Sequence, residues 1–207
     1  MTETMTKNDT IQAVIEKLES IFTVFNEHIF NGQLEKPIII VAPDTMRGSY
    51  GWCSSKKIWK GDEEQEFYEI NLCAEYLTRP FEETTETLLH EMIHLKNMMD
   101  GVKDTSRSGK YHNRKFRDTA ERYGLEVEQD SKYGFSRTKY SEKTLAWLNA
   151  EFPEENAFPL YRMKFLEPPK KSNTKKYVCP VCGAIVRATK EVHVKCEDCD
   201  ESMVLED

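Results

Sequence analysis

The sequence predicts an α+β domain followed by a small cysteine-rich module. Apolar residues with helical spacing fill residues 10–30, and a short β-branched run follows at residues 37–41. Two C-x-x-C pairs lie between Cys179 and Cys199. Helices and short strands in this order are typical of an α+β domain, and paired cysteines are typical of a structural zinc site.

The first expected helix covers residues 10 to 30. Its apolar side chains recur every three or four residues and are expected to form one buried face: Ile11, Ile15, Leu18, Phe22, Phe25 and Ile29. The dipeptide Asn31-Gly32 is expected to end this helix. His28 lies beside the apolar face, so a helix-surface or core role is expected for it rather than metal binding.

Three extended segments are expected next. The run from Pro37 to Val41 indicates a buried strand, and residues 49–54 and 66–72 indicate two more. Cys53 and Cys73 fall in these strands, where they are expected to be small buried residues.

Two further helices are expected after the strands. One starts near Thr78–Pro80 and ends at Gly101. The other runs from about His112 to Tyr123 and is closed by Gly124. The first of them carries the motif with the strongest chemical content.

The pattern is weaker beyond Leu125, where residues 141–150 are the one short helical candidate. Residues 168–173 read Pro-Pro-Lys-Lys-Ser-Asn and indicate a linker. The expected organisation is a core, an extension with the linker, and a cysteine module: residues 8–125, 126–172 and 173–207.

Composition favours a cytoplasmic protein. Hydrophobic residues make up 39% of the 207 residues, which allows a real core, and no run approaches the ~18 apolar residues of a membrane helix. The first ten residues are polar and lack the apolar stretch of a signal peptide. In a reducing compartment the six cysteines are expected to be thiols or metal ligands rather than disulfides.

Charge is unevenly distributed along a chain with a formal net charge of −7. The stretch from Lys103 to Arg117 contains six basic residues and one acidic residue. The stretch from Lys170 to Lys195 contains seven basic residues and one acidic residue. Such patches can contact phosphates, although plain solvated charge is an equal expectation. The candidate nucleic-acid-binding residues are Lys170, Lys171, Lys175, Lys176 and Arg187.

The run His90-Glu91-Met92-Ile93-His94 lies within the second expected helix. Residues four apart share a helix face, so His90 and His94 can point two imidazoles at one zinc ion. Glu91 can then reach a water on the open metal position and take its proton. Two surface histidines on an ordinary helix are the alternative. Candidate donors to the oxyanion are Tyr111, Arg107 and Tyr140.

Catalytic zinc commonly takes three protein ligands, and His112 is the natural third one. It is expected to open the third helix, with Phe116 and Ala120 facing inward beside it. Asp118 and Glu121 are weaker rivals, because they fall off that face. A helix-terminal histidine among basic neighbours is the remaining alternative.

The cysteine module predicts a second zinc site. Two C-x-x-C pairs, separated by thirteen residues, form a set of four thiolates for a tetrahedral zinc ion: Cys179, Cys182, Cys196 and Cys199. Residues 184–194 are rich in β-branched side chains and are expected to form strands of a zinc ribbon. An iron–sulfur site or free thiols are the alternatives.

Four segments resemble the SprT-like family, whose eukaryotic relatives include the Spartan proteases. They are Phe30–Leu34, Ile70–Leu72, Thr87–His94 and Gly109–Phe116. The resemblance implies a compact zincin-like α+β fold with a three-ligand catalytic zinc. It also implies His90, His94 and His112 as ligands and Glu91 as the acid/base.

The resemblance further implies a zinc metallopeptidase that acts on protein substrates near DNA, because Spartan-type members cleave proteins trapped covalently on DNA during repair. The expected cofactors are one catalytic and one structural zinc ion, and the expected partners are a protein substrate and DNA. No membrane partner and no small-molecule cofactor is expected. The alternative is a zinc-stabilised nucleic-acid or transcription-associated binding protein with weak or no proteolysis.

Overall fold

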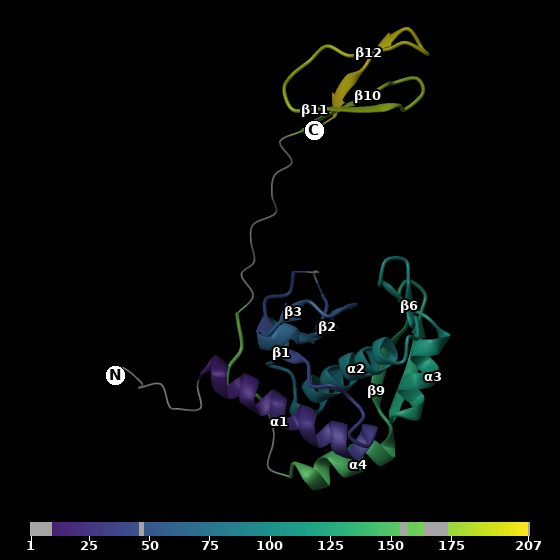
Figure 1. Cartoon of the computed structure of the whole chain (residues 1–207). Coiled ribbons are helices and arrows are strands. Elements are labelled where there is room, and N and C mark those ends of the chain that lie inside the picture. Colours follow the sequence, from purple (N-terminus) through teal and green to yellow (C-terminus); the bar gives the residue numbers. More distant parts are fainter. Residues whose placement is uncertain (1–9, 46–47, 154–156, 164–173, 207) are drawn as a thin grey trace. The chain divides into compact units, whose positions relative to one another are not determined.

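The computed structural model describes residues 10–45, 48–153, 157–163 and 174–206. The chain divides into two compact units, Met1–Lys164 and Phe165–Asp207 (Figure 1). Helices and strands are mixed, as an α+β fold requires. Among the described helices, none combines the length and the apolar character needed to cross a membrane.

Helix α1 (Ile11–Phe30) confirms the first expected helix. Thr10 caps its start, where its hydroxyl accepts from the Ala13 amide at 3.1 Å, and Asn31 ends it in a left-handed conformation. The buried face is rotated from the expected one and comprises Val14, Leu18, Ile21, Phe22, Phe25 and Phe30. Ile11, the first residue of the helix, is 46% exposed.

The first sheet has the strand order β1-β5-β2. Strand β1 (Ile38–Ala42) runs parallel to β5 (Glu69–Cys73), and β2 (Gly51–Cys53) runs antiparallel to β5 along the other side. Every residue of β5 is buried, whereas Cys53 in β2 is only half-buried. The expected burial is therefore confirmed for Cys73 and is only partial for Cys53.

A short hairpin lies between β2 and β5 in the chain, and a short turn follows β5. Strands β3 (Trp59–Lys60) and β4 (Glu66–Phe67) form a hairpin with the 3-10 turn η1 (Asp62–Glu64) between them. A second 3-10 turn, η2 (Ala74–Tyr76), follows β5.

Helix α2 (Phe81–Met99) is the central helix of the first unit. It packs against β2 and β5 on one side and against α3 and β9 on the other (Figure 1). Its apolar side chains are almost fully buried, because both sides are covered: Leu88, Leu89, Met92, Ile93 and Leu95.

The second sheet has the order β6-β7-β9-β8. Its strands are β6 (Thr105–Ser106), β7 (Tyr111–His112), β8 (Leu125–Asp130) and β9 (Gly134–Tyr140). Only Leu125 is fully buried in β8, and its other side chains are mostly polar or charged. A strand with one buried residue shows little apolar alternation, which is why the β8–β9 hairpin is not evident from the sequence.

Helix α3 (Arg114–Arg122) begins later than expected. His112 belongs to β7, and Asn113 caps the helix by accepting from the Lys115 amide at 2.8 Å. The expectation that His112 opens this helix is therefore wrong, although Phe116 and Ala120 do face inward and are fully buried.

Helix α4 (Glu142–Glu151) confirms the short helical candidate at residues 141–150. Leu148 is fully buried, and Trp147 stacks on His28 of α1 with ring centroids 4.0 Å apart. His28 therefore has the structural role expected of it. Residues 125–153 pack within the first unit rather than outside it.

The second unit contains a three-stranded sheet and a two-stranded ladder. Strand β10 (Lys175–Val178) lies between β11 (Ile185–Ala188) and β14 (Val204–Glu206), while β12 (Lys195–Cys196) pairs with β13 (Glu201–Ser202). Of the expected ribbon strands in residues 184–194, β11 is present and residues 189–194 form none. The expected linker at residues 168–173 lies outside the described residues.

Candidate metal centre

Three histidines converge between α2 and β7. His90 and His94 lie one turn apart on α2, and His112 faces them from β7. The Nε2 atom of His112 lies 3.2 Å from that of His90 and 3.1 Å from that of His94. The ring of Phe116 contacts all three imidazoles, with centroid separations of 4.6 to 4.7 Å. The three predicted metal ligands therefore lie close together, against the aromatic ring of Phe116.

The donor set fits a zinc ion. Burial lowers the pKa of His90 well below its usual range and lowers that of His112 to about 4, so both rings are neutral at neutral pH. A neutral imidazole aims one lone pair at its neighbours, and converging lone pairs repel unless a cation lies among them. Zinc–nitrogen bonds of about 2.0–2.1 Å place tetrahedral ligand atoms roughly 3.3–3.4 Å apart, close to the separations observed here.

Asp104 holds His94 from behind. This carboxylate is fully buried, and its Oδ2 accepts from His94 Nδ1 at 2.6 Å and from Asn97 at 3.0 Å. Burial lowers the pKa of His94, but the hydrogen bond to Asp104 and the negative charges of Glu91 and Asp104 together leave that pKa raised. Because the proton sits on Nδ1, the Nε2 lone pair of His94 is free to face the metal position.

Glu91 lies next to the histidines but outside their ligand group. Its side chain is buried, and burial raises the pKa of the carboxyl to about 7, against the influence of His94. The backbone amide of Cys53 in β2 acts on this carboxylate and lowers its pKa. Glu91 is therefore buried beside β2, the strand that runs next to α2.

Gly51 lets β2 lie close to α2 beside Glu91. A Cβ at this position would lie 2.7 Å from the backbone oxygen of Asn71 and 3.3 Å from Cγ of Glu91. Only a residue without a side chain fits such a gap.

The rival residues lie elsewhere. Asp118 and Glu121 are exposed on α3 and are not part of the histidine group. Tyr140 donates its hydroxyl to Thr85 in the core at 3.1 Å, so it does not serve as an oxyanion donor. Arg107 lies over the ring of Tyr111 at 4.7 Å.

The sequence did not reveal three residues that support the histidines. Asp104 is visible only as the single acid of a basic stretch, and Thr138 lies in the unrecognised strand β9. Thr138 Oγ1 lies 2.9 Å from His90 Nδ1 and also donates to Glu86. Burial raises the pKa of Glu86 to about 7, while the hydrogen bond from Thr138 acts in the opposite direction.

The four cysteines of the second unit also converge. Their sulfur atoms lie within 4.8 Å of one another, with Cys182 Sγ and Cys196 Sγ 3.7 Å apart. Backbone amides of Cys182 and Val181 lower the pKa of Cys179 to about 7, which favours a thiolate. A donor set of four sulfurs fits a structural zinc site.

The predicted nucleic-acid-binding bases are partly neutralised. Lys175 pairs with Glu191 at 2.8 Å, and Lys176 pairs with Glu206. Arg187 is exposed, while Lys170 and Lys171 lie outside the described residues. Among the described members of this set, two lysines are therefore paired with acids and Arg187 is exposed.

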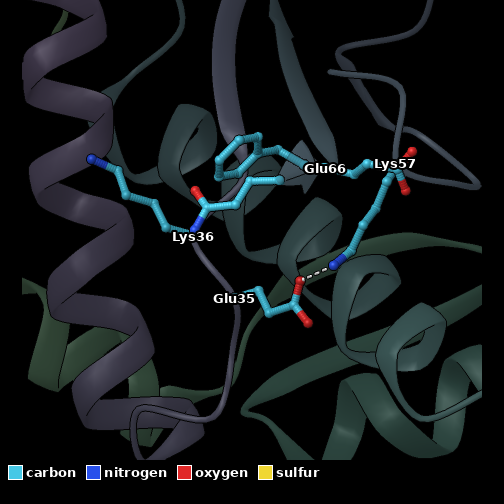
Figure 2. A pocket seen from close by; sticks show the side chains of 6 residues that line it. Glu35, Lys36, Lys57 and Glu66 are labelled. Carbon is cyan, nitrogen blue, oxygen red and sulfur yellow. Dashed lines mark ion pairs between the residues drawn. The ribbon is translucent and has the colours of Figure 1, made fainter. Parts of the chain in front are cut away.

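A separate hollow of about 490 Å³ lies where residues 35–36 meet the β3–β4 hairpin. Figure 2 shows Lys57 reaching across it to Glu35, with Nζ and Oε2 2.6 Å apart. Both side chains are partly exposed, and none of the converging histidines or cysteines lines this hollow. The hollow is therefore separate from both groups of possible metal ligands in the described residues.

Comparison with known proteins agrees with this geometry. The model of the SprT-like family matches residues 18–138, a span that contains all three converging histidines and Glu91. Neither the curated proteins nor the solved structures contain a match to the chain. Because the family match covers more than half of the 207 residues, the chain belongs to the SprT-like family.

Proposed function

We propose that this chain is a zinc-dependent metallopeptidase, with His90, His94 and His112 as metal ligands and Glu91 as acid/base. Membership of the SprT-like family supports a metallopeptidase-like function. The observation that carries the proposal is the position of His112 Nε2, 3.2 Å from His90 Nε2 and 3.1 Å from His94 Nε2. The buried carboxylate of Glu91 lies on the helix that carries His90 and His94.

The chemistry follows from the roles of these side chains. A zinc ion held by three imidazoles supplies Lewis acidity, which lowers the pKa of a bound water and polarises a carbonyl. Glu91 takes the proton of the attacking water on a carboxylate oxygen and returns it to the nitrogen of the leaving amine. Burial raises the pKa of the Glu91 carboxyl, which favours the return of the proton to the amine.

The proposed substrates are proteins bound or crosslinked to DNA. The basic stretch from Lys103 to Arg117 includes β7, which carries His112, and its single acid, Asp104, is buried. Arg117 pairs with Asp118 at 2.6 Å, while Arg107, Lys110, Arg114 and Lys115 are exposed. Phosphates of a nucleic acid are suitable ligands for such a surface.

The test uses the purified full-length chain and a DNA-binding protein as substrate, with and without DNA. Glu91→Gln is expected to keep its zinc, because Glu91 is not a ligand, and to lose about 10²–10⁴-fold in cleavage rate. Glu82→Gln, an exposed change in the first turn of α2, is the matched control and should cleave normally. If the wild type binds DNA and zinc but cleaves nothing, a binding protein is the better description.

A further inference from the structure

Thr138 links the metal helix to the second sheet at the outer nitrogen of His90. Its Oγ1 lies 2.9 Å from His90 Nδ1 and donates to Oε1 of Glu86, one turn earlier on α2. Thr138 lies on β9 and is half-buried. The three side chains form a continuous path from a carboxylate to an imidazole.

Counting protons assigns the tautomer of His90 when Glu86 is ionised. A threonine hydroxyl carries one hydrogen, and Thr138 gives it to Glu86. The oxygen of Thr138 can then only accept from His90, so the ring proton resides on Nδ1. The Nε2 lone pair of His90 consequently points toward the other two histidines.

His94, the other histidine on α2, bonds to a carboxylate directly. His94 donates Nδ1–H directly to Asp104 at 2.6 Å, whereas His90 reaches a carboxylate only through the Thr138 hydroxyl. Nδ1 of His112 has no hydrogen-bond partner among the described residues. Two of the three imidazoles are thus oriented by a hydrogen bond at Nδ1: His90 by Thr138 of β9, and His94 by Asp104 of the loop after α2.

We propose that Thr138 and Glu86 are positioning residues that fix the His90 tautomer and thereby set the affinity of the histidine centre for zinc. This inference rests on the proposed function insofar as it takes His90 to be a metal ligand. Outer partners of metal-binding histidines orient the ring and raise its basicity, and losing one costs about 10–100-fold in metal affinity.

The first measurement is the zinc dissociation constant of the histidine centre, by competition with a chromophoric chelator on the full-length chain. Thr138→Val keeps the shape and removes the hydroxyl, so the constant is expected to rise about 10–100-fold. Thr138→Ser keeps a hydroxyl and should bind zinc as the wild type does. The four-cysteine site should keep its zinc in every variant and serves as an internal reference.

Thr85→Val is the matched control. It removes the buried hydroxyl of Thr85 on α2, which bonds to Tyr140 and to backbone carbonyls of its own helix but to no metal ligand. Its zinc affinity should equal that of the wild type. An equal loss in Thr85→Val and Thr138→Val would assign the effect to general destabilisation and overturn the inference.

The role of Glu86 is tested by a double-mutant cycle. Glu86→Ala leaves the Thr138 proton free to turn toward His90, which favours the wrong tautomer and should weaken zinc binding. Because both residues act through one path, the double variant should bind zinc no more weakly than Thr138→Val alone. Additive losses would contradict a shared path.

The inference and the proposed function fail in different ways. If the wild type binds zinc at the histidines and Thr138→Val binds it equally tightly, the positioning role is wrong and the proposed function stands. If His90→Ala binds as much zinc as the wild type, His90 is not a ligand and the proposed function itself fails.

Discussion

Individual side chains of the histidine centre differ in how far the sequence reveals them. His90 and His94 follow from helical spacing alone, because residues four apart must share a face. His112 was placed near them although its element was misassigned: β7 ends one residue before the cap of α3. Asp104 and Thr138 could not be predicted, since Asp104 contacts His94 only because the loop after α2 folds back, and Thr138 contacts His90 from β9, 48 residues further along the chain.

Removing His112 tests the centre at the scale of one residue. His112→Ala deletes one of three converging nitrogens, so the chain is expected to hold about one zinc ion instead of about two and to lose nearly all peptidase activity. Metal analysis and a cleavage assay on the same samples check this. His193→Ala changes an exposed histidine outside both ligand groups and should retain both zinc ions. Two zinc ions in His112→Ala would exclude His112 as a ligand.

The packing of β2 against α2 determines the surroundings of Glu91. Strand β2 lies against α2 at Gly51, next to the side chain of Glu91. The sequence predicts extended segments at residues 49–54 and 66–72, which contain β2 and most of β5, and a helix that contains α2. It did not predict how close β2 comes to α2, because a glycine indicates a close approach only once its neighbours are known.

Gly51→Ala is the corresponding test at the scale of two elements. Its Cβ meets the Asn71 backbone oxygen, which cannot rotate away, so β2 must shift. We expect a loss of about 1–3 kcal/mol in the free energy of unfolding. We also expect up to about a 10²-fold lower cleavage rate, because Glu91 is displaced. Denaturant titration and kinetics measure the two effects.

The control for that change is Gly61→Ala in the β3–β4 hairpin. There the added Cβ meets the ring of Phe67 at 3.1 Å, a side chain that can move. Its stability should fall by less, and its cleavage rate should match that of the wild type. A normal rate in Gly51→Ala would show that Glu91 tolerates movement of β2.

The whole molecule combines two units that are stabilised in different ways. The first has one continuous apolar core contributed by helices α1 to α4 and the first sheet. The buried side chains of the described part of the second unit are Tyr177, Cys179 and Cys196, two of which belong to the cysteine cluster. We expect a unit with so little apolar burial to need a bound metal in order to fold.

The cysteine unit should therefore unfold alone when its metal is lost. Cys196→Ser removes one buried ligand, and amide hydrogen exchange should then lose protection in residues 174–206 while α2 stays protected. The histidine centre should keep its zinc, since its ligands come from the first unit only. Loss of protection in α2 would mean that the first unit depends on the second for its stability.

Truncation after Pro169 separates the contributions of the two units to DNA binding. Zinc should fall from about two ions to about one, and peptidase chemistry at the histidines should remain. Lys175 and Lys176 are engaged with acids, but Arg187 is exposed, so DNA affinity is expected to fall while its steep salt dependence persists through the Lys103–Arg117 stretch. The control, Lys110→Ala combined with Arg107→Ala in the full chain, should flatten the salt dependence instead. Equal DNA affinity in the truncated and full-length chains would assign DNA contact to the first unit and leave the cysteine unit for a protein partner.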